Sequence, residues 1–137
     1  MTLQHEGLDI LTEGECRQLL EQTKLGRVVI ATGGIAVVFP VNYGVIGGDI
    51  FFFTGEGTKL TAADHDMTVT FEADTVDFAS ESGWSVLVVG TASMADAKLR
   101  PRVEAVGVYP WAGGDRHRLI RIRPDVITGR RINPYGG

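Results

Sequence analysis

One short segment of the sequence carries the residue types of an anion-binding loop. Residues 54–59 follow the very apolar stretch Ile50–Phe53 and precede a stretch with helical character, Leu60–His65. The segment consists of Thr54, Gly55, Glu56, Gly57, Thr58 and Lys59. Backbone N–H groups at the start of a helix attract a phosphate, and a lysine adds a point charge. The segment therefore predicts a phosphate site, with a plain strand-to-helix turn as the alternative.

A second segment, Phe39–Tyr43, has the properties of a strand that lies against a planar ring. Pro40 cannot donate to a β-ladder, so the strand should be at an edge or bulged there. Its backbone can then face a heterocycle, together with the amide of Asn42 and the amphipathic ring of Tyr43. The alternative interpretation is an edge strand that ends in a turn.

Other catalytic signatures are absent from the sequence. It contains no HxxxH or CxxC metal pattern, no GxSxG nucleophile motif, and neither GxxxxGK[ST] nor GxGxxG. His5, His65 and His117 are scattered, so no metal site is expected. The single cysteine, Cys16, excludes an internal disulfide framework and is expected to be buried.

The size and charge of the chain point to a single domain, residues 1–137. A hydrophobic fraction of 44% argues against disorder, and a net charge of −4 argues against a nucleic-acid coat. The charge is uneven, with nine Lys and Arg against three Asp and Glu from Lys98 onward. Leu119–Arg123 has no interleaved aromatic residues, which also argues against nucleic-acid binding. The absence of a signal peptide and of a long apolar run predicts a cytoplasmic protein that does not enter the membrane.

A set of short elements must position these segments. Thr12 and Glu15 predict a capping box at the start of a helix over 13–24, which Gly26 ends. Two hairpins with Gly-Gly turns are expected next: Arg27–Thr32 with Ile35–Tyr43, and Val45–Ile46 with Ile50–Thr54.

The second half of the chain predicts further strands. Met67–Asp74 alternates apolar and polar residues, and Trp84–Met94 follows, with Gly90 as a bend or bulge. After these come a helical stretch that starts near Pro101 and two last strands: Leu99–Val106, Arg118–Arg123 and Val126–Ile132. Seven or so short strands with two or three short helices predict a closed or partly closed antiparallel barrel.

The order of these segments resembles the flavin-binding split-barrel superfamily. The similarity rests on Pro-Val-Asn-Tyr at 40–43, on Ile-Phe-Phe-Phe-Thr at 50–54 with its Gly-rich loop and lysine, and on Ser-Gly-Trp-Ser-Val at 82–86. It looks closest to the pyridoxamine 5′-phosphate oxidase-related branch that includes nitroimidazole-resistance-like proteins, and it covers roughly residues 10–132. The resemblance implies a mainly β (α+β) fold, a six- to seven-stranded antiparallel split β-barrel with short flanking helices.

The resemblance also implies a site. Pro40, Val41, Asn42 and Tyr43 would contact the isoalloxazine ring of FMN, with backbone amides near Val41 and Asn42 stabilising it. Thr54, Gly57, Thr58 and Lys59 would hold the ribityl phosphate. Trp84 and Ser85 would reach the cofactor from the second subunit of a homodimer that holds its cofactors at the interface. Trp84, Tyr109 and Trp111 are large enough to anchor such an interface or to fill a core.

Two departures from the family pattern limit these expectations. The C-terminal stretch from Thr128 lacks the Arg- and His-containing pattern that binds a substrate phosphate, so vitamin B6 oxidation is not expected. Gly34, Ile35 and Ala36 stand where the family has an arginine. The deazaflavin F420 or haem could then replace FMN, haem with one of the three histidines as its ligand.

Two functions remain from the sequence. The first is an FMN- or F420-dependent oxidoreductase that acts on a small molecule. The alternative is a non-catalytic flavin- or haem-binding protein on the same fold. Four arginines of the basic C-terminal third could favour an anionic substrate or form a solvated face: Arg121, Arg123, Arg130 and Arg131.

Overall fold

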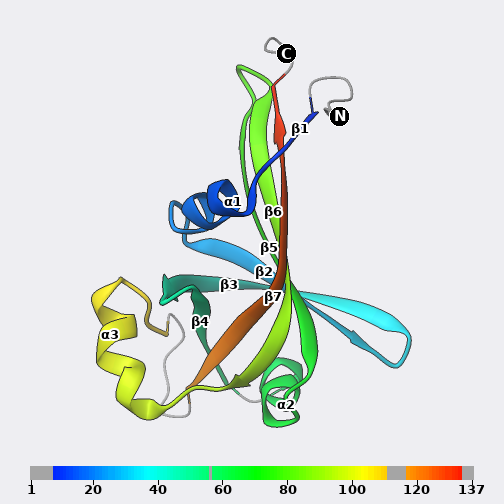
Figure 1. The fold of residues 1–137 in the computed structure, drawn as a ribbon. Helices are drawn as coiled ribbons and strands as arrows, with labels where there is room; N and C mark the ends of the chain where they lie inside the picture. The colour runs from blue at the N-terminus through cyan, green and yellow to red at the C-terminus, as the bar shows by residue number, and fades with distance from the viewer. Residues whose placement is uncertain (1–7, 56, 111–116, 134–137) are drawn as a thin grey trace.

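The computed structural model describes residues 8–55, 57–110 and 117–133, which form seven strands and three short α-helices (Figure 1). The elements are β1 (Leu8–Ile10), α1 (Glu13–Leu20), β2 (Leu25–Thr32), β3 (Ile35–Ile46), β4 (Asp49–Thr54), α2 (Thr58–Asp64), β5 (Thr68–Asp77), β6 (Ser82–Met94), the 3₁₀-helix η1 (Ala97–Leu99), α3 (Arg100–Ala105) and β7 (Arg118–Ile132). No helix within these described ranges is long and apolar enough to cross a membrane.

The strands form one antiparallel sheet that closes on itself. Their order is β1-β7-β4-β3-β2-β5-β6, and an additional pairing joins β6 to β7. Strands β2 to β7 therefore make a six-stranded barrel, and β1 is added along the edge of β7. This arrangement confirms the predicted mainly β fold with short flanking helices.

The barrel is split between β3 and β4. These strands pair only from Tyr43 opposite Phe52 to Ile46 opposite Asp49. From Asn42 back to its start, β3 pairs with β2 alone, and their hairpin projects away from the barrel (Figure 1). Pro40 pairs with Arg27 on β2 within this one-sided stretch, which confirms the edge position that its missing N–H requires.

Tight glycine turns set the register of the two hairpins. Gly33-Gly34 and Gly47-Gly48 all have φ between 58° and 85°, the left-handed region that two-residue hairpin turns need. Thr32 then faces Ile35 in the first hairpin, and Ile46 faces Asp49 in the second. The predicted turns are confirmed, but Val45 and Ile46 continue β3 and do not form a separate strand.

The core fills the barrel with the inward residues of each strand. Tyr43, Phe52 and Phe71 are its largest fully buried side chains. The Tyr43 hydroxyl donates a 2.6 Å hydrogen bond to the carbonyl oxygen of Leu20, and its ring meets Phe71 edge-on. Burial raises the pKa of Tyr43, with a smaller contribution from the Glu72 carboxylate, so the phenol stays neutral.

Helix α1 covers one end of the core. Thr12 and Glu15 form the predicted capping box, and Cys16, Leu19 and Leu20 are buried. Burial raises the pKa of the Cys16 thiol, in keeping with an inert packing role. The helix ends at Leu20, four residues before the predicted end, because β2 begins at Leu25.

Gly26 was expected to end this helix and instead lies inside β2. A Cβ atom there would stand 2.2 Å from the Phe71 ring. The glycine is therefore needed for close packing against the core, and its helix-ending signal was misleading.

Two other elements differ from prediction. Arg118–Ile132 is one continuous strand, whereas the sequence suggested two strands separated at Pro124. The ladder steps from Val89 opposite Val126 to Gly90 opposite Pro124, so Asp125 is the extra residue of a β-bulge. The bulge accommodates the proline and confirms the irregularity predicted at Gly90. Helix α2 starts at Thr58, two residues earlier than expected.

Candidate cofactor site

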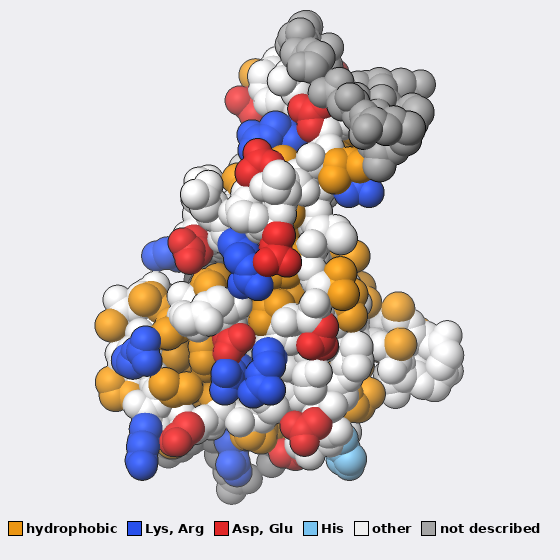
Figure 2. Space-filling view, viewed as in Figure 1, with side chains coloured by type: hydrophobic (Ala, Val, Ile, Leu, Met, Phe, Trp, Pro, Cys, Tyr) orange, Lys and Arg blue, Asp and Glu red, His pale blue; other side chains and the backbone are white. Residues whose placement is uncertain are grey.

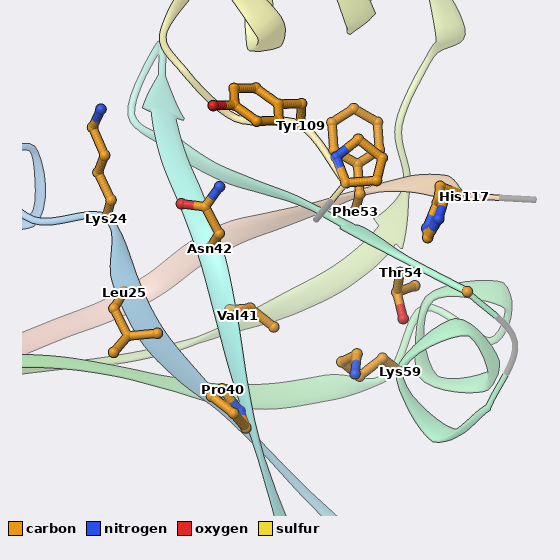
Figure 3. Close-up of a pocket in the computed structure, with 12 residues that line it drawn as sticks. Lys24, Leu25, Pro40, Val41, Asn42, Phe53, Thr54, Lys59, Tyr109 and His117 are labelled. Atoms are coloured by element: carbon orange, nitrogen blue, oxygen red, sulfur yellow. The ribbon is translucent and has the colours of Figure 1, made fainter. Parts of the chain in front are cut away.

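A cavity of about 420 Å³ lies where β3 and β4 separate (Figure 3). We call it the split cavity. Five predicted site residues line it: Pro40, Val41, Asn42, Thr54 and Lys59. Seven further residues complete the lining: Lys24, Leu25, Phe53, Gly55, Tyr109, Pro110 and His117. Two segments that are separate in the sequence thus meet at one cavity, as the sequence predicted.

The backbone of β3 is oriented toward this cavity at alternate residues. The Tyr43 N–H donates to the Lys24 carbonyl oxygen at 2.9 Å, so odd-numbered residues of β3 direct their peptide groups toward β2. Pro40 and Asn42 direct theirs the other way, toward the split. The backbone amide of Val41, expected to face a ring, therefore points toward β2, and that of Asn42 points toward the split.

Lys59 stands on the opposite side of the cavity from Lys24, with Thr54 beside it (Figure 3). Its ammonium nitrogen lies 4.3 Å from the centroid of the Phe39 ring, a cation–π contact. Burial lowers the pKa of Lys59, because the cavity wall removes water from the charged group. An anion at this place would restore the favourable environment of the ammonium.

The lining of the split cavity combines apolar walls with cationic and hydrogen-bonding groups. Phe53 and Tyr109 supply aromatic rings, while Lys24, Lys59 and His117 supply basic groups. Among the described residues that line the cavity, none carries a carboxylate. The cavity thus has the composition of a site for a flat molecule with an anionic part.

Five predicted site residues do not line the split cavity. Tyr43 lies in the core, and Gly57 and Thr58 form the start of α2 next to Lys59. Trp84 and Ser85 lie on β6 and line a second cavity of about 350 Å³, with Leu8, Asp74, Val76, Arg130 and Ile132. Any contact of Trp84 or Ser85 with a ligand in the split cavity would need a second copy of the chain.

Lys24 and Leu25 were not predicted as site residues, because residues up to 24 were expected to be helical. The hairpin itself holds the missing signal. With a two-residue turn at Gly33-Gly34, counting back along both strands sets Leu25 opposite Asn42, as the structure does. Phe53, Tyr109 and His117 reach the cavity through tertiary folding, which no local pattern indicates.

Arg121, one of the arginines considered for an anionic substrate, is already engaged. Its Nε and Nη2 donate to Oδ2 of Asp49 at 2.6 and 2.5 Å, and both side chains are partly buried. Arg130 donates from Nη1 to the Gly129 carbonyl oxygen. Figure 2 shows Lys and Arg side chains next to Asp and Glu side chains, so no purely basic surface covers that side of the molecule.

The two histidines in the described ranges, His65 and His117, lie in different surroundings. A ring nitrogen of His65 lies 2.8 Å from the Thr61 carbonyl oxygen, and His117 lines the split cavity. His5 and Trp111 lie outside the described residues. Within the described part of the chain, no three His, Cys, Asp or Glu side chains are grouped to hold a metal ion.

The sequence matches the model of the pyridoxamine 5′-phosphate oxidase family over residues 12–131. An FAD-binding protein from Mycobacterium smegmatis is 37% identical, with a TM-score of 0.75 over 90% of this chain and 99% of that protein. A candidate 5-nitroimidazole antibiotic resistance protein from Bacteroides thetaiotaomicron is 15% identical, with a TM-score of 0.69 over 96% of this chain and 95% of that protein.

An FAD- and haem-binding protein from Mycobacterium smegmatis is 13% identical, with a TM-score of 0.71 over 96% of this chain and 75% of that protein. At identities this low, these last two matches show a shared fold. Together with the family match, they confirm the resemblance drawn from the sequence.

Proposed function

The chain belongs to the pyridoxamine 5′-phosphate oxidase family, and on that basis we propose that it is a flavin-dependent oxidoreductase whose flavin occupies the split cavity. The observation that carries the proposal is the meeting of the β3 backbone at Pro40 and Asn42 with the cation Lys59 across one cavity. Its volume of about 420 Å³ lies within the usual range of small-molecule sites.

The residues present fit the two ends of a flavin nucleotide. The ring system would lie along Pro40–Asn42, where β3 has no strand on its second side and Phe53 and Tyr109 add apolar surface. The phosphate would lie at Lys59 and Thr54, with Thr58 next to Lys59 in the chain. A charge-assisted hydrogen bond from the ammonium is the strongest single contact available there.

A bound flavin supplies the redox chemistry, and the chain supplies binding and orientation. The backbone of Asn42 faces the split, so the ring would lie against it. Lys59 would hold the phosphate end and so fix the position of the ring along β3. The apolar wall would keep water from the exposed edge of the ring, and a small-molecule substrate would enter from the open side.

The proposal includes a homodimer in which Trp84 and Ser85 of one copy complete the split cavity of the other. The support is that both residues are exposed to a cavity on β6 and that neither lines the split cavity of its own chain. The cytoplasmic location and the lack of nucleic-acid and membrane partners stay predictions of the sequence.

Two observations favour different flavins as the cofactor. The sequence resemblance favours FMN, with F420 as an alternative, whereas the solved relative at 37% identity binds FAD. FAD has a second phosphate, and Lys24 on the far side of β3 is a further cation at the cavity. Haem is the second candidate, because His117 lines the cavity and imidazole is a common axial ligand of haem iron.

The test is an absorbance titration of the purified protein with FMN, FAD, F420 and haem separately. Saturation near one flavin per chain, with a shifted flavin band, is the expected result, and the tightest ligand identifies the cofactor. A Soret band shift with haem alone would favour the haem-binding alternative. Failure to bind any flavin would remove the functional proposal and leave the fold unaffected.

A second measurement separates the oxidoreductase from a storage or sensing protein. The bound flavin is mixed with NADH or NADPH in the absence of oxygen, and bleaching of its band is followed. Reduction on a time scale of seconds to minutes is expected of an enzyme. A flavin that binds tightly but is reduced only at the rate of free flavin would favour the non-catalytic alternative.

A further inference from the structure

One end of the split cavity carries three polar side chains from three parts of the chain. They are Thr54 of β4, Lys59 of α2 and His117, which directly precedes β7. The ladder between β4 and β7 ends with Thr54 opposite Arg118, so His117 lies just beyond its last pair. In Figure 3, Thr54 lies between His117 and Lys59 on one side of the cavity. We call these three side chains the Lys59 end of the cavity.

The Thr54 hydroxyl is available to a ligand at this end. Thr54 is a buried polar residue, with 6% of its surface exposed, and a buried hydroxyl normally has a hydrogen-bond partner. Within the described part of the chain, every fully buried side-chain oxygen and nitrogen has a partner, but no side chain or backbone group there bonds to this hydroxyl. The Thr54 oxygen is therefore reached from the cavity, and it points toward the side where Lys59 stands (Figure 3).

Two basic groups stand beside this hydroxyl. Burial lowers the pKa of Lys59, which shows that the ammonium group has lost part of its hydration. His117 adds an imidazole, the side chain that gains a proton between pH 5 and pH 8. The other ionisable groups around the cavity are Lys24, Tyr109 and the exposed Arg118, and none of them is acidic in this pH range. Among the described residues that line the cavity, no carboxylate competes for the two cations.

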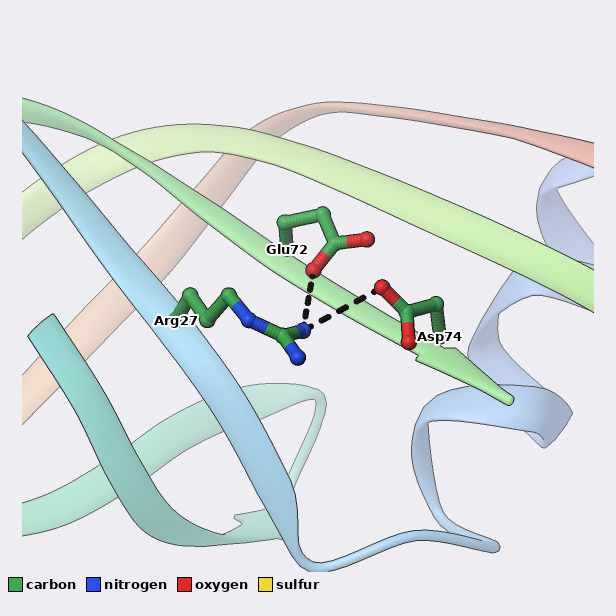
Figure 4. Close-up of polar contacts among 3 residues, drawn as sticks. All are labelled: Arg27, Glu72 and Asp74. Atoms are coloured by element: carbon green, nitrogen blue, oxygen red, sulfur yellow. Dashed lines mark hydrogen bonds and ion pairs between the residues drawn. The ribbon is translucent and has the colours of Figure 1, made fainter. Parts of the chain in front are cut away.

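Arg27 of β2, by contrast, has its anionic partners within the chain. Its Nη1 donates to Glu72 at 2.9 Å and to Asp74 at 3.2 Å, and both carboxylates are on β5 (Figure 4). Lys59 and His117 instead face a cavity whose described lining offers positive charge and hydrogen-bond donors. An anionic ligand would supply the partner that these groups lack among the lining residues.

We propose that His117 and Lys59 together bind a phosphomonoester dianion at the Lys59 end, with a further hydrogen bond from the Thr54 hydroxyl. This inference rests on the proposed function and deepens it, because it makes FMN the flavin. The phosphate of FMN is a terminal group that carries two negative charges above a second pKa of about 6. An ammonium and an imidazolium group match both charges. Each phosphate of FAD is linked on two sides and carries one charge, and riboflavin has no phosphate.

The direction of the pH effect follows from the charge of the imidazole. A bound dianion favours the protonated ring, so the complex binds more protons than the free chain and free FMN together. FMN affinity should therefore be highest at low pH and fall between pH 6.5 and pH 8.5, a range in which the phosphate stays mostly dianionic. Riboflavin affinity should not change over this range, because riboflavin lacks the group that His117 contacts.

Fluorescence titrations with FMN, FAD and riboflavin at pH 6.5 and pH 8.5 test the proposal. At pH 6.5, the wild type should bind FMN about tenfold or more tightly than FAD or riboflavin, as expected for one charged hydrogen bond. His117→Gln should weaken FMN binding at pH 6.5 about tenfold and remove its pH dependence. It should leave the riboflavin Kd unchanged. A pH dependence that persists in this variant would assign the effect to Lys59 and overturn the role of His117.

Two further variants separate a charge effect from a structural one. His117→Arg keeps a cation at every pH tested, so it should bind FMN tightly and equally at pH 6.5 and pH 8.5. His65→Gln, at an exposed histidine that ends α2 outside the cavity, should keep the wild-type affinities and pH dependence. A purely structural role of His117 would instead weaken riboflavin binding as well and would not be rescued by arginine.

A measurement without flavin keeps this inference distinct from the proposed function. Inorganic phosphate is added to the ligand-free wild type, and the imidazole signals are followed by NMR, with those of His117 assigned by their loss in His117→Gln. The His117 signals should shift with phosphate, and those of His65 should not. A shift in a chain that binds no flavin would count only against the proposed function.

Three results would overturn the inference. They are His117 signals that do not respond to phosphate, equal FMN affinities of the wild type and His117→Gln, and tighter binding of FAD than of FMN at pH 6.5. Circular dichroism of each variant verifies that the fold is retained, so that a weaker affinity reports on the site.

Discussion

The ammonium nitrogen of Lys59 lies 4.3 Å from the centroid of the Phe39 ring, and this cation–π contact holds the side chain in place. The contact directs a partly dehydrated cation toward the cavity, where burial already lowers its pKa. Binding of a phosphate would replace the lost hydration of this cation. The cation–π contact and the partial burial together explain how Lys59 can recognise an anion.

The contribution of Lys59 is testable by deletion of its charge. Lys59→Ala should weaken flavin binding about tenfold or more, since a hydrogen bond to a charged group is worth roughly 1.5–3 kcal/mol. Fluorescence titration of the flavin measures the change, and Lys98→Ala, at a lysine of η1 outside the cavity, is the control. Equal affinities for the Lys59→Ala variant and the wild type would mean that the phosphate lies elsewhere.

Substitution of Tyr43 should lower the stability of the chain and leave its flavin affinity unchanged. Tyr43→Phe removes the donor to the buried Leu20 carbonyl oxygen and should lower the free energy of unfolding by about 1–3 kcal/mol. Flavin affinity should stay at the wild-type value, because Tyr43 does not line the split cavity. Urea unfolding and a flavin titration measure the two quantities. A loss of affinity without a loss of stability would restore Tyr43 to the site.

The sequence predicted those cavity residues that short sequence motifs identify. Proline in an apolar strand identified the edge at Pro40, and the Gly/Thr/Lys loop identified Thr54 and Lys59. The same patterns could not show that Tyr43 turns inward, because a strand residue's side is fixed only when its register is known. His117 is remote in the sequence, and only the barrel brings it to the cavity.

At the scale of elements, two close contacts decide where α1 and β6 can pack. A Cβ atom on Gly129 of β7 would stand 2.6 Å from the Cys16 sulfur of α1 and 3.0 Å from the Ser85 carbonyl oxygen of β6. The glycine therefore lets the helix approach the strand directly. The alternation of residues along β7 could not predict this contact. It shows which side of the sheet Gly129 faces, but not that α1 packs against that side.

The Gly129→Ala variant should therefore unfold more easily, by about 1–3 kcal/mol, as expected for overpacking of a tight contact. The matched substitution Gly14→Ala should instead stabilise the chain by about 0.5–1 kcal/mol. Gly14 lies within α1 with nothing within 4 Å of its Cβ position, and alanine is the better helix former. Equal stability of the two variants would contradict the close packing of α1 on β7.

The elements themselves were predictable where their patterns were strong. The alternation of Val69, Phe71 and Ala73 gave β5, and the glycine pairs gave both hairpins. Pro124 was misleading, because proline usually ends a strand, and here a bulge at Asp125 lets β7 continue through it.

At the scale of the molecule, the exposed apolar surface and the proposed two-copy arrangement make stability depend on concentration. Association stabilises the folded state by mass action, so the thermal midpoint at pH 6 should rise as protein concentration rises. Differential scanning fluorimetry over a hundredfold concentration range measures the midpoint. Leu87→Lys, at an exposed side chain of β6 two residues after Ser85, should abolish the rise. A midpoint independent of concentration in the wild type would indicate that the folded chain does not depend on a second copy.

The strand pairing that closes the barrel was beyond the local patterns. They predicted strands and a closed or partly closed antiparallel barrel, but pairing of residues 83–94 with 120–132 depends on contacts between distant segments. The family resemblance supplied the split barrel that the patterns could not. The exposed side chains of Leu8, Val76 and Ile132 could be grouped only with the register, since they are far apart in the sequence and near each other in the sheet.

The position of β7 has a consequence for how the chain folds. It pairs with β1, β4 and β6, so neither the barrel nor the β1 edge can form before residues 118–132 are available. During synthesis on the ribosome, β4 and β6 would each wait with an open edge until this last strand emerges. Such non-local pairing makes folding slow, typically milliseconds to seconds, and exposes those edges to other nascent chains. Folding of the barrel therefore depends on how soon residues 118–132 follow β4 and β6 out of the ribosome.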